Sequence, residues 1–257
     1  MILVVLYPPR TTPTREAVDA LARATGRAIY EARLWLASPL PHVVARVGER
    51  AEAERSVTAL RSAGFVCEWI ENDALASASE MVLARSPRFR DDGLDANAER
   101  DEFLPWDEIA ALVLAKSSVA VERTSNELVV EQGPRGSTEV TTRELTRRER
   151  SVQNVLYVFP RAGVPWLFEE NGVRWATLGI PLLPTRRDNF KRLVDRLRAN
   201  AIRATFDDSM VRYPPPQFDL VLVREYEDAR ASPNRAMDVA AHLIARQALR
   251  ARSAPYR

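Results

Sequence analysis

The stretch HVVARVGERAEAERSVTALRSAGFVCEWI, residues 42–70, places two strand patterns on either side of one helix pattern. Residues 42–47 form a short apolar run that is typical of a strand. Residues 50–64 carry apolar side chains at helical spacing, and Gly64 suits the left-handed turn that closes a helix. Residues 65–70 alternate as in a second strand. A strand, a helix and a strand are therefore expected here.

The preceding residues add one strand and two helices. Residues 2–7 are continuously apolar and are closed by two prolines, which predicts a strand. Thr12 is expected to cap a helix that continues to Gly26, and a shorter helix is expected at 29–37. The predicted order for residues 1–72 is strand, helix, helix, strand, helix, strand.

This region resembles a known family. The segment TGRAIYEAR, residues 25–33, is similar to TGLGLKEAK in the C-terminal domain of the large-subunit ribosomal stalk protein. Residues 39–43 and 53–69 resemble the rest of that domain, whose fold the Clp protease adaptor family shares. The resemblance implies a fold, because function is not fixed by fold alone. It also implies a candidate partner-binding surface at the positions where the stalk domain meets its factors: Arg27, Tyr30 and Arg33.

The middle of the chain, residues 78–205, is expected to be rich in short strands. The predicted strands are 81–84, 109–115, 119–121, 128–131, 155–159, 166–169 and 173–177. The acidic segment 88–108, with a net charge of −5, is expected to be a solvated loop. A turn is predicted at 133–136, and Asn171-Gly172 predicts a hairpin. Thr185 is expected to cap an amphipathic helix.

Many strands closed by one helix resemble a pleckstrin-homology-like barrel, and the alternative is an open sheet with helices on one face. In the C-terminal extension, residues 206–257, the prolines 214–216 interrupt the chain. A strand at 218–222 and a helix from Ser232-Pro233 to about Arg250 are expected. The predicted fold class is α+β, with a small β-α-α-β-α-β domain at 1–72 and a β-rich domain at 78–205.

Composition narrows the class of protein. The chain has 257 residues, is 46% hydrophobic and 28% charged, and carries a net charge of +2. Only Lys116 and Lys191 are lysines, and the other 35 basic residues are arginines spread among the acids. This spread favours codon bias in a GC-rich genome over a nucleic-acid stripe. Cys67 is the only cysteine, and no apolar run is long enough to span a membrane. A cytoplasmic location is expected.

Side chains with catalytic potential are few. The two histidines, His42 and His242, are expected to be structural, and they form no metal-ligand spacing with Cys67. No phosphate-binding glycine motif is present. We therefore predict no catalytic, metal-ligating or cofactor-binding residues. An enzyme with an unfamiliar site near Asp207, Asp208 and Arg212 is a minor alternative.

One arginine-rich segment stands out, and its basic residues are Arg143, Arg147, Arg148 and Arg150. Such a patch would suit RNA, a phosphoinositide or an acidic protein, but the interleaved glutamates also suit a polar outer strand. The leading prediction for the whole chain is a non-enzymatic adaptor that binds an unidentified protein partner. The alternative is a nucleic-acid-binding or ribosome-associated protein that uses its arginines.

Overall fold

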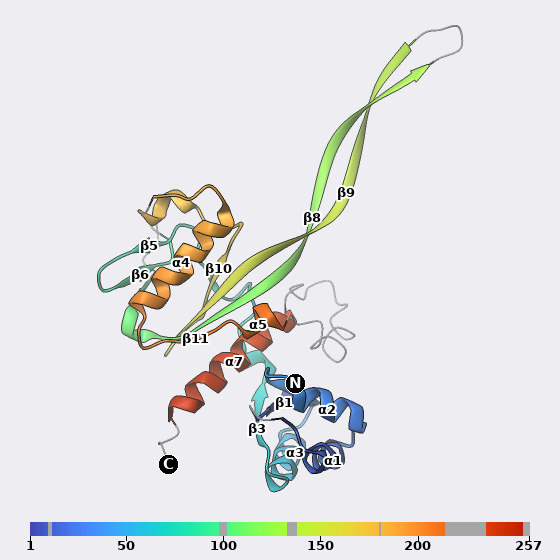
Figure 1. The fold of residues 1–257 in the computed structure, drawn as a ribbon, viewed down its shortest axis with the longest axis vertical. Helices are drawn as coiled ribbons and strands as arrows, with labels where there is room; N and C mark the ends of the chain where they lie inside the picture. Colours follow the sequence, from blue (N-terminus) through green and yellow to red (C-terminus); the bar gives the residue numbers. More distant parts are fainter. Residues whose placement is uncertain (10–11, 98–101, 133–137, 180, 214–234, 254–257) are drawn as a thin grey trace.

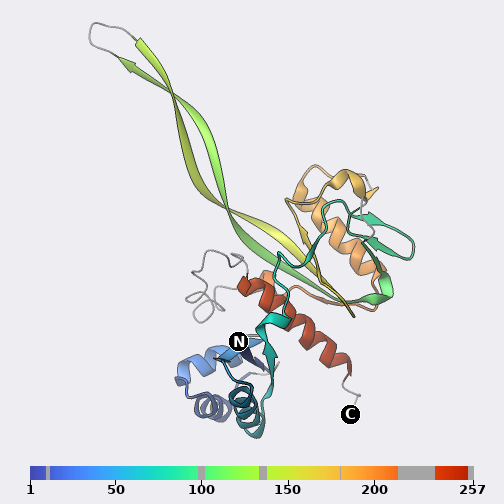
Figure 2. The same cartoon turned by 180° about the vertical axis from the view of Figure 1, so that it is seen from behind.

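The chain has an α+β fold in which one helix lies between two sheets (Figures 1 and 2). The computed structural model describes residues 1–9, 12–97, 102–132, 138–179, 181–213 and 235–253, and for 118–151 and 251–253 it describes the backbone alone. The predicted strand at 218–222 and the predicted turn at 133–136 fall outside the described residues.

The N-terminal elements follow the predicted order. They are β1 (Ile2–Tyr7), α1 (Arg15–Thr25), α2 (Ile29–Ala37), β2 (His42–Val47), α3 (Arg50–Ser62) and β3 (Val66–Glu71). The strands form an antiparallel sheet in the order β2-β1-β3. The helix α1 is capped by Thr14, whose side chain accepts the Ala17 N–H at 3.2 Å, so the prediction of Thr12 as the cap was wrong by one half-turn. Gly26 ends α1 in the left-handed conformation, as expected.

In the larger part of the chain, the described residues form seven strands followed by a helix. They are β4 (Val82–Leu83), β5 (Arg88–Phe89), β6 (Gly93–Asp95), β7 (Phe103–Pro105), β8 (Ile109–Gln132), β9 (Thr138–Pro160), β10 (Trp166–Glu169) and α4 (Arg186–Asn200). Then come β11 (Thr205–Asp207), α5 (Ser209–Arg212) and α7 (Arg235–Ser253). One sheet has the order β11-β8-β9-β10-β4, and a smaller sheet has the order β5-β6-β7. A β-rich region followed by a helix is thus present, and its main sheet is open, with α4 on one face.

Three predictions in this region were wrong. Segment 88–108 is not a solvated loop but contains the β5-β6-β7 sheet, because Leu94 and Leu104 are buried against the main core. Residues 173–177 do not form a strand, and Asn171-Gly172 makes no hairpin. The chain instead turns at Gly172, whose N–H donates to the Glu169 carbonyl at 2.9 Å, and enters the short 3-10 helix Trp175–Leu178.

The strands β8 and β9 form a long two-stranded arm. They pair from Ile109↔Pro160 to Gln132↔Thr138 with one register shift between Ile109 and Ala111, so the three predicted strands 109–115, 119–121 and 128–131 are parts of one strand. Beyond about Ser117 no third strand accompanies the pair in the described part of the chain. At about 3.3 Å per residue, the arm extends roughly 50 Å. Figure 1 shows it twisting away from the body.

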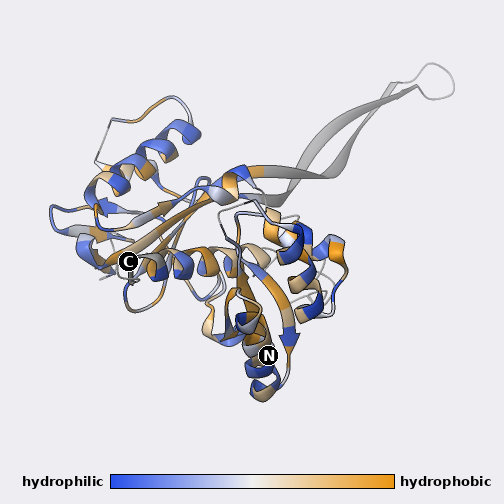
Figure 3. Ribbon diagram, turned by 60° about the horizontal axis from the view of Figure 1, so that its bottom comes forward, coloured by the Kyte–Doolittle hydropathy of each residue, from blue (hydrophilic) through white to orange (hydrophobic). Residues whose placement is uncertain are grey.

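The helix α7 packs on both sheets. Val239 and Leu243 contact the outer face of the N-terminal sheet, where Leu3 and Val5 are buried. The opposite side of α7, through Ala240, Ala241 and Ile244, packs on the β8–β9 face that carries Val113 and Tyr157. The other face of that sheet is covered by α4. Figure 3 shows apolar residues concentrated along these central strands.

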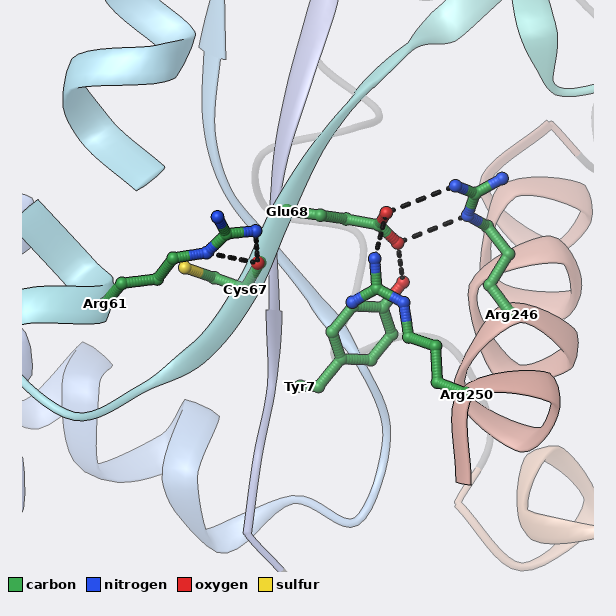
Figure 4. A network of polar contacts seen from close by, with 6 residues as sticks. All are labelled: Tyr7, Arg61, Cys67, Glu68, Arg246 and Arg250. Carbon is green, nitrogen blue, oxygen red and sulfur yellow. Dashed lines mark hydrogen bonds and ion pairs between the residues drawn. The ribbon is translucent and has the colours of Figure 1, made fainter. Parts of the chain in front are cut away.

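A buried carboxylate joins α7 to the N-terminal sheet (Figure 4). Glu68 of β3 accepts the Tyr7 hydroxyl at 2.5 Å and two N–H groups of Arg246 at 3.1 and 3.2 Å. Arg250 also donates to it, and its guanidinium lies 5.0 Å from the Tyr7 ring centroid. Burial raises the pKa of Glu68, but the hydrogen bonds from Arg246 and Tyr7 and the two arginine charges outweigh burial and leave it below its usual value.

Further polar contacts hold α7 to the connector after β3. Arg235 donates to the carbonyls of Leu75 at 2.7 Å and Asn72 at 2.8 Å. Asp238, which is fully buried, accepts the Ala78 N–H at 2.8 Å and the Tyr157 hydroxyl at 2.9 Å. Burial raises the pKa of Asp238. The contacts with the connector join residues about 160 positions apart and the contact with Tyr157 joins residues 81 apart, so α7 is an integral part of the packing.

Candidate functional site

The outer side of α2 exposes an unusual set of apolar side chains. Ile29, Tyr30 and Leu34 are 60%, 70% and 51% exposed, although large apolar side chains are most often buried. Arg27 and Arg33 are also exposed. We call these five residues the α2 surface. At 3.6 residues per turn, its helical members fall within an arc of roughly 140°.

The inner side of α2 explains why this surface is held rigidly. Ala32 and Leu36 are buried in the core between the helices and the N-terminal sheet. At the start of the helix, the Glu31 carboxylate accepts the Ala28 N–H at 3.2 Å. Glu31 is thereby engaged in capping, which leaves the arginines of the α2 surface available for an acidic partner. The helix is apolar on both sides, which is typical of an element with contacts on both sides.

The structure places all three predicted partner-binding residues, Arg27, Tyr30 and Arg33, on this surface. Sequence reasoning did not include Ile29 and Leu34. The available signal was the composition of residues 29–37, which carry apolar side chains on every side instead of along one stripe. Apolar surface that is exposed and flanked by charge is characteristic of interaction sites.

The predicted basic patch lies on the arm. Arg143, Arg147, Arg148 and Arg150 all belong to β9, opposite Glu127, Arg123, Glu122 and Ala120. For these four arginines the structure describes the backbone and not the side chains. Between positions 118 and 151 the sequence contains as many glutamates as arginines, which makes the arm neutral overall.

The minor alternative site near Asp207 does not converge on one point. Asp207 accepts the Ser209 N–H at 2.8 Å and thereby starts α5. Asp208 forms an exposed ion pair with Arg212, four residues later. The two carboxylates therefore serve different local contacts. Among the described residues, no group of three or more histidine, cysteine or acidic side chains could hold a metal ion.

Both histidines are buried. His42 lies on β2, 6.5 Å from the Trp35 ring, and burial lowers its pKa to about 4. His242 of α7 donates from Nε2 to the Ala76 carbonyl at 3.0 Å, and burial is the main cause that lowers its pKa to about 4. His242 also lines a cleft of about 410 Å³ whose described lining contains acids but no hydroxyl or thiol. The neutral imidazole is thus committed to a structural hydrogen bond.

A second cleft of about 410 Å³ lies where the arm leaves the body. We call it the arm-root groove, and α4 and β11 border it together with β8 and β9. It contains both lysines of the chain, Lys116 and Lys191. Sequence reasoning noted the two lysines but gave them no role, because they are 75 positions apart and only folding brings them to one cleft.

Comparisons with family models, with curated proteins and with solved structures find no match for this chain. The resemblance to the ribosomal stalk and Clp adaptor domains therefore stays a prediction. None of the helices in the described ranges combines the length and apolar composition needed to cross a bilayer.

Proposed function

We propose that this protein is a non-catalytic adaptor that docks a partner protein on the α2 surface. The observation that carries the proposal is the exposure of Ile29, Tyr30 and Leu34 on a helix whose other side is fixed in the core. Tyrosine and arginine are among the residue types that contribute most to binding at protein interfaces.

The expected partner presents apolar side chains with acidic neighbours. Arg27 and Arg33 would then meet carboxylates, while Ile29, Tyr30 and Leu34 lose contact with water on binding. The rigid backing by Ala32 and Leu36 supports tight docking, because little conformational entropy is lost when a pre-ordered helix binds. The alternative, a nucleic-acid-binding protein, depends on the arginines of the arm. The arm carries as many glutamates as arginines, so it has no net positive charge to attract the phosphate backbone.

Site-specific photo-crosslinking in the host cell tests the proposal. A photoreactive amino acid replaces Tyr30 in the full chain, and a matched control replaces Arg55, which is exposed on α3. We expect a discrete crosslinked protein from position 30 and none from position 55. The partner, once identified by mass spectrometry, should bind the Tyr30→Ala variant roughly 30-fold more weakly, the loss expected for a hot-spot aromatic.

Thermal unfolding of the variants shows whether the fold is intact. Tyr30 is largely solvent-exposed, so its replacement should leave the unfolding midpoint within about 2 °C. Equal crosslinking from positions 30 and 55, or unchanged partner affinity of a folded Tyr30→Ala protein, would refute docking on the α2 surface.

A further inference from the structure

The arm-root groove gathers positive charge from two separate elements. Lys116 is on β8, and Arg187, Lys191 and Arg198 are on one side of α4. The lining residues are Leu114, Lys116, Asn154, Arg187, Phe190, Lys191, Val194, Asp195, Arg198, Phe206 and Asp208. Four cations thus face two carboxylates, so the groove favours an anionic ligand.

Neighbouring contacts increase this excess of positive charge. Asp208 is paired with Arg212, which reduces its capacity to neutralise the groove cations. Within the described part of the chain, Lys116, Arg187 and Lys191 form no ion pair. Arg187 also lies in the first turn of α4, where the helix dipole adds to the attraction for an anion.

The floor of the groove is apolar and partly aromatic. Phe190 and Val194 are buried beneath it, and Phe206 is half-buried. The Arg198 guanidinium lies 4.0 Å from the Phe206 ring centroid. The flat ring of a ligand can stack on the Phe206 ring or on the plane of the Arg198 guanidinium, as bases stack on such side chains in single-strand binding proteins.

The identity of the lysines gives a second, independent argument. In a chain where 35 of 37 basic residues are arginine, the two lysines lie in one cleft. Lysine presents a compact ammonium on a flexible stem, which suits a point contact with phosphate, whereas arginine favours planar bidentate pairing. The composition bias that explains the arginines does not explain why both lysines are here.

We propose that the arm-root groove binds a nucleotide unit, with Lys116 and Lys191 holding the phosphate and the base stacking beside Phe206 and Arg198. The cleft volume of about 410 Å³ lies in the range of small-ligand sites. The unit could be a free nucleotide or one residue of a single-stranded nucleic acid. This site is separate from the α2 surface and does not depend on the adaptor function.

Binding measurements on the full-length protein test the site. The probes are a fluorescein-labelled 12-nucleotide single-stranded DNA, read by anisotropy, and AMP and UMP, read as competitors and by calorimetry. The lysines are exchanged together in a Lys116→Gln/Lys191→Gln variant, and the control is Arg55→Gln, which removes a positive charge from α3, away from the groove. All three positions are exposed, so the fold should be unaffected.

We expect the double lysine variant to bind at least tenfold more weakly than the wild type and the Arg55→Gln control. The slope of log affinity against log salt should fall by about one per lost phosphate contact. Full displacement of the oligonucleotide by AMP or UMP would identify a mononucleotide site. Incomplete displacement with affinity that increases with oligonucleotide length would identify a nucleic-acid strand.

A Phe206→Leu variant separates nucleotide recognition from simple charge attraction. It should weaken AMP and oligonucleotide binding severalfold while leaving tripolyphosphate binding unchanged, because only the base loses its stacking partner. Absence of wild-type binding to every nucleotide probe at millimolar concentration would overturn the proposal. So would unchanged binding by the lysine variant, equal effects of Phe206→Leu on all anions, or lysine-dependent binding only to phosphatidylserine vesicles.

Discussion

Replacing Glu68 should loosen the contact between α7 and the N-terminal sheet. The Glu68 side chain is only 9% exposed, and its carboxylate accepts hydrogen bonds from Tyr7, Arg246 and Arg250. Glu68→Gln keeps an acceptor for the Tyr7 hydroxyl but removes the negative charge. Glu68→Ala removes both, and it leaves the buried Tyr7 hydroxyl without its acceptor.

The expected magnitudes follow from the exposure of the partners. The Arg246 and Arg250 side chains are 45% and 41% exposed, so water compensates part of what each loses, and each pair contributes at most about 1 kcal/mol. Glu68→Gln should therefore lower the free energy of unfolding by about 1–2 kcal/mol. Glu68→Ala should cost about 3 kcal/mol, because an unsatisfied buried hydroxyl adds about 1–3 kcal/mol.

Urea unfolding followed by tryptophan fluorescence measures these differences, with Glu52→Gln on the exposed side of α3 as the control. A double-mutant cycle of Glu68→Gln with Arg246→Gln should give a coupling energy of about 1 kcal/mol. The pKa of Glu68 is lowered in the fold, so its stabilising effect is complete above its unfolded value of 4.5 and is lost as the pH falls below that. The stabilities of the wild type and Glu68→Gln should therefore converge as the pH falls through the folded-state pKa of Glu68.

A stability difference below 0.3 kcal/mol at pH 7, or a coupling energy near zero, would refute this reasoning. Either result would mean that the arginines are equally well solvated without Glu68. The apolar contacts of α7 would then account for its position, and the Glu68 network would be electrostatically neutral in its net effect.

Three further predictions concern stability. His42 and His242 have pKa values of about 4 in the fold against 6.5 ordinarily, so unfolding takes up protons between these values. Stability should decrease as the pH falls from 6.5 to 4, and ring-proton NMR titrations should show midpoints near 4; midpoints near 6.5 would contradict burial. Gly93→Ala should destabilise by at least 1–3 kcal/mol, because the new Cβ would lie 2.5 Å from the Leu104 carbonyl oxygen, and an unchanged melting temperature would exclude that close approach. Thr185→Ala should cost about 1 kcal/mol in urea unfolding, since Thr185 accepts an N–H of the first turn of α4 at 3.1 Å, whereas Thr185→Ser should cost little.

Local sequence signals were sufficient for the elements of residues 1–72 and for α4. Gly26 ends α1 because glycine readily adopts the left-handed conformation, and Thr185 begins α4 because its side chain accepts the Asp188 N–H. Both signals depend on residues no more than four positions away. On the α2 surface, the resemblance singled out Arg27, Tyr30 and Arg33, whereas the exposure of Ile29 and Leu34 is seen only in the structure.

Long-range contacts settled the remainder. The segment 88–108 became a sheet because the core buries Leu94 and Leu104, and its many acids gave no local sign of this. Glu68 is 178 positions from Arg246, and Lys116 reaches the cleft of Lys191 only through the packing of α4 on the sheet. Periodicity and caps report on a residue's near neighbours, whereas burial and charge pairing depend on which distant surfaces meet, and that follows from packing the whole chain.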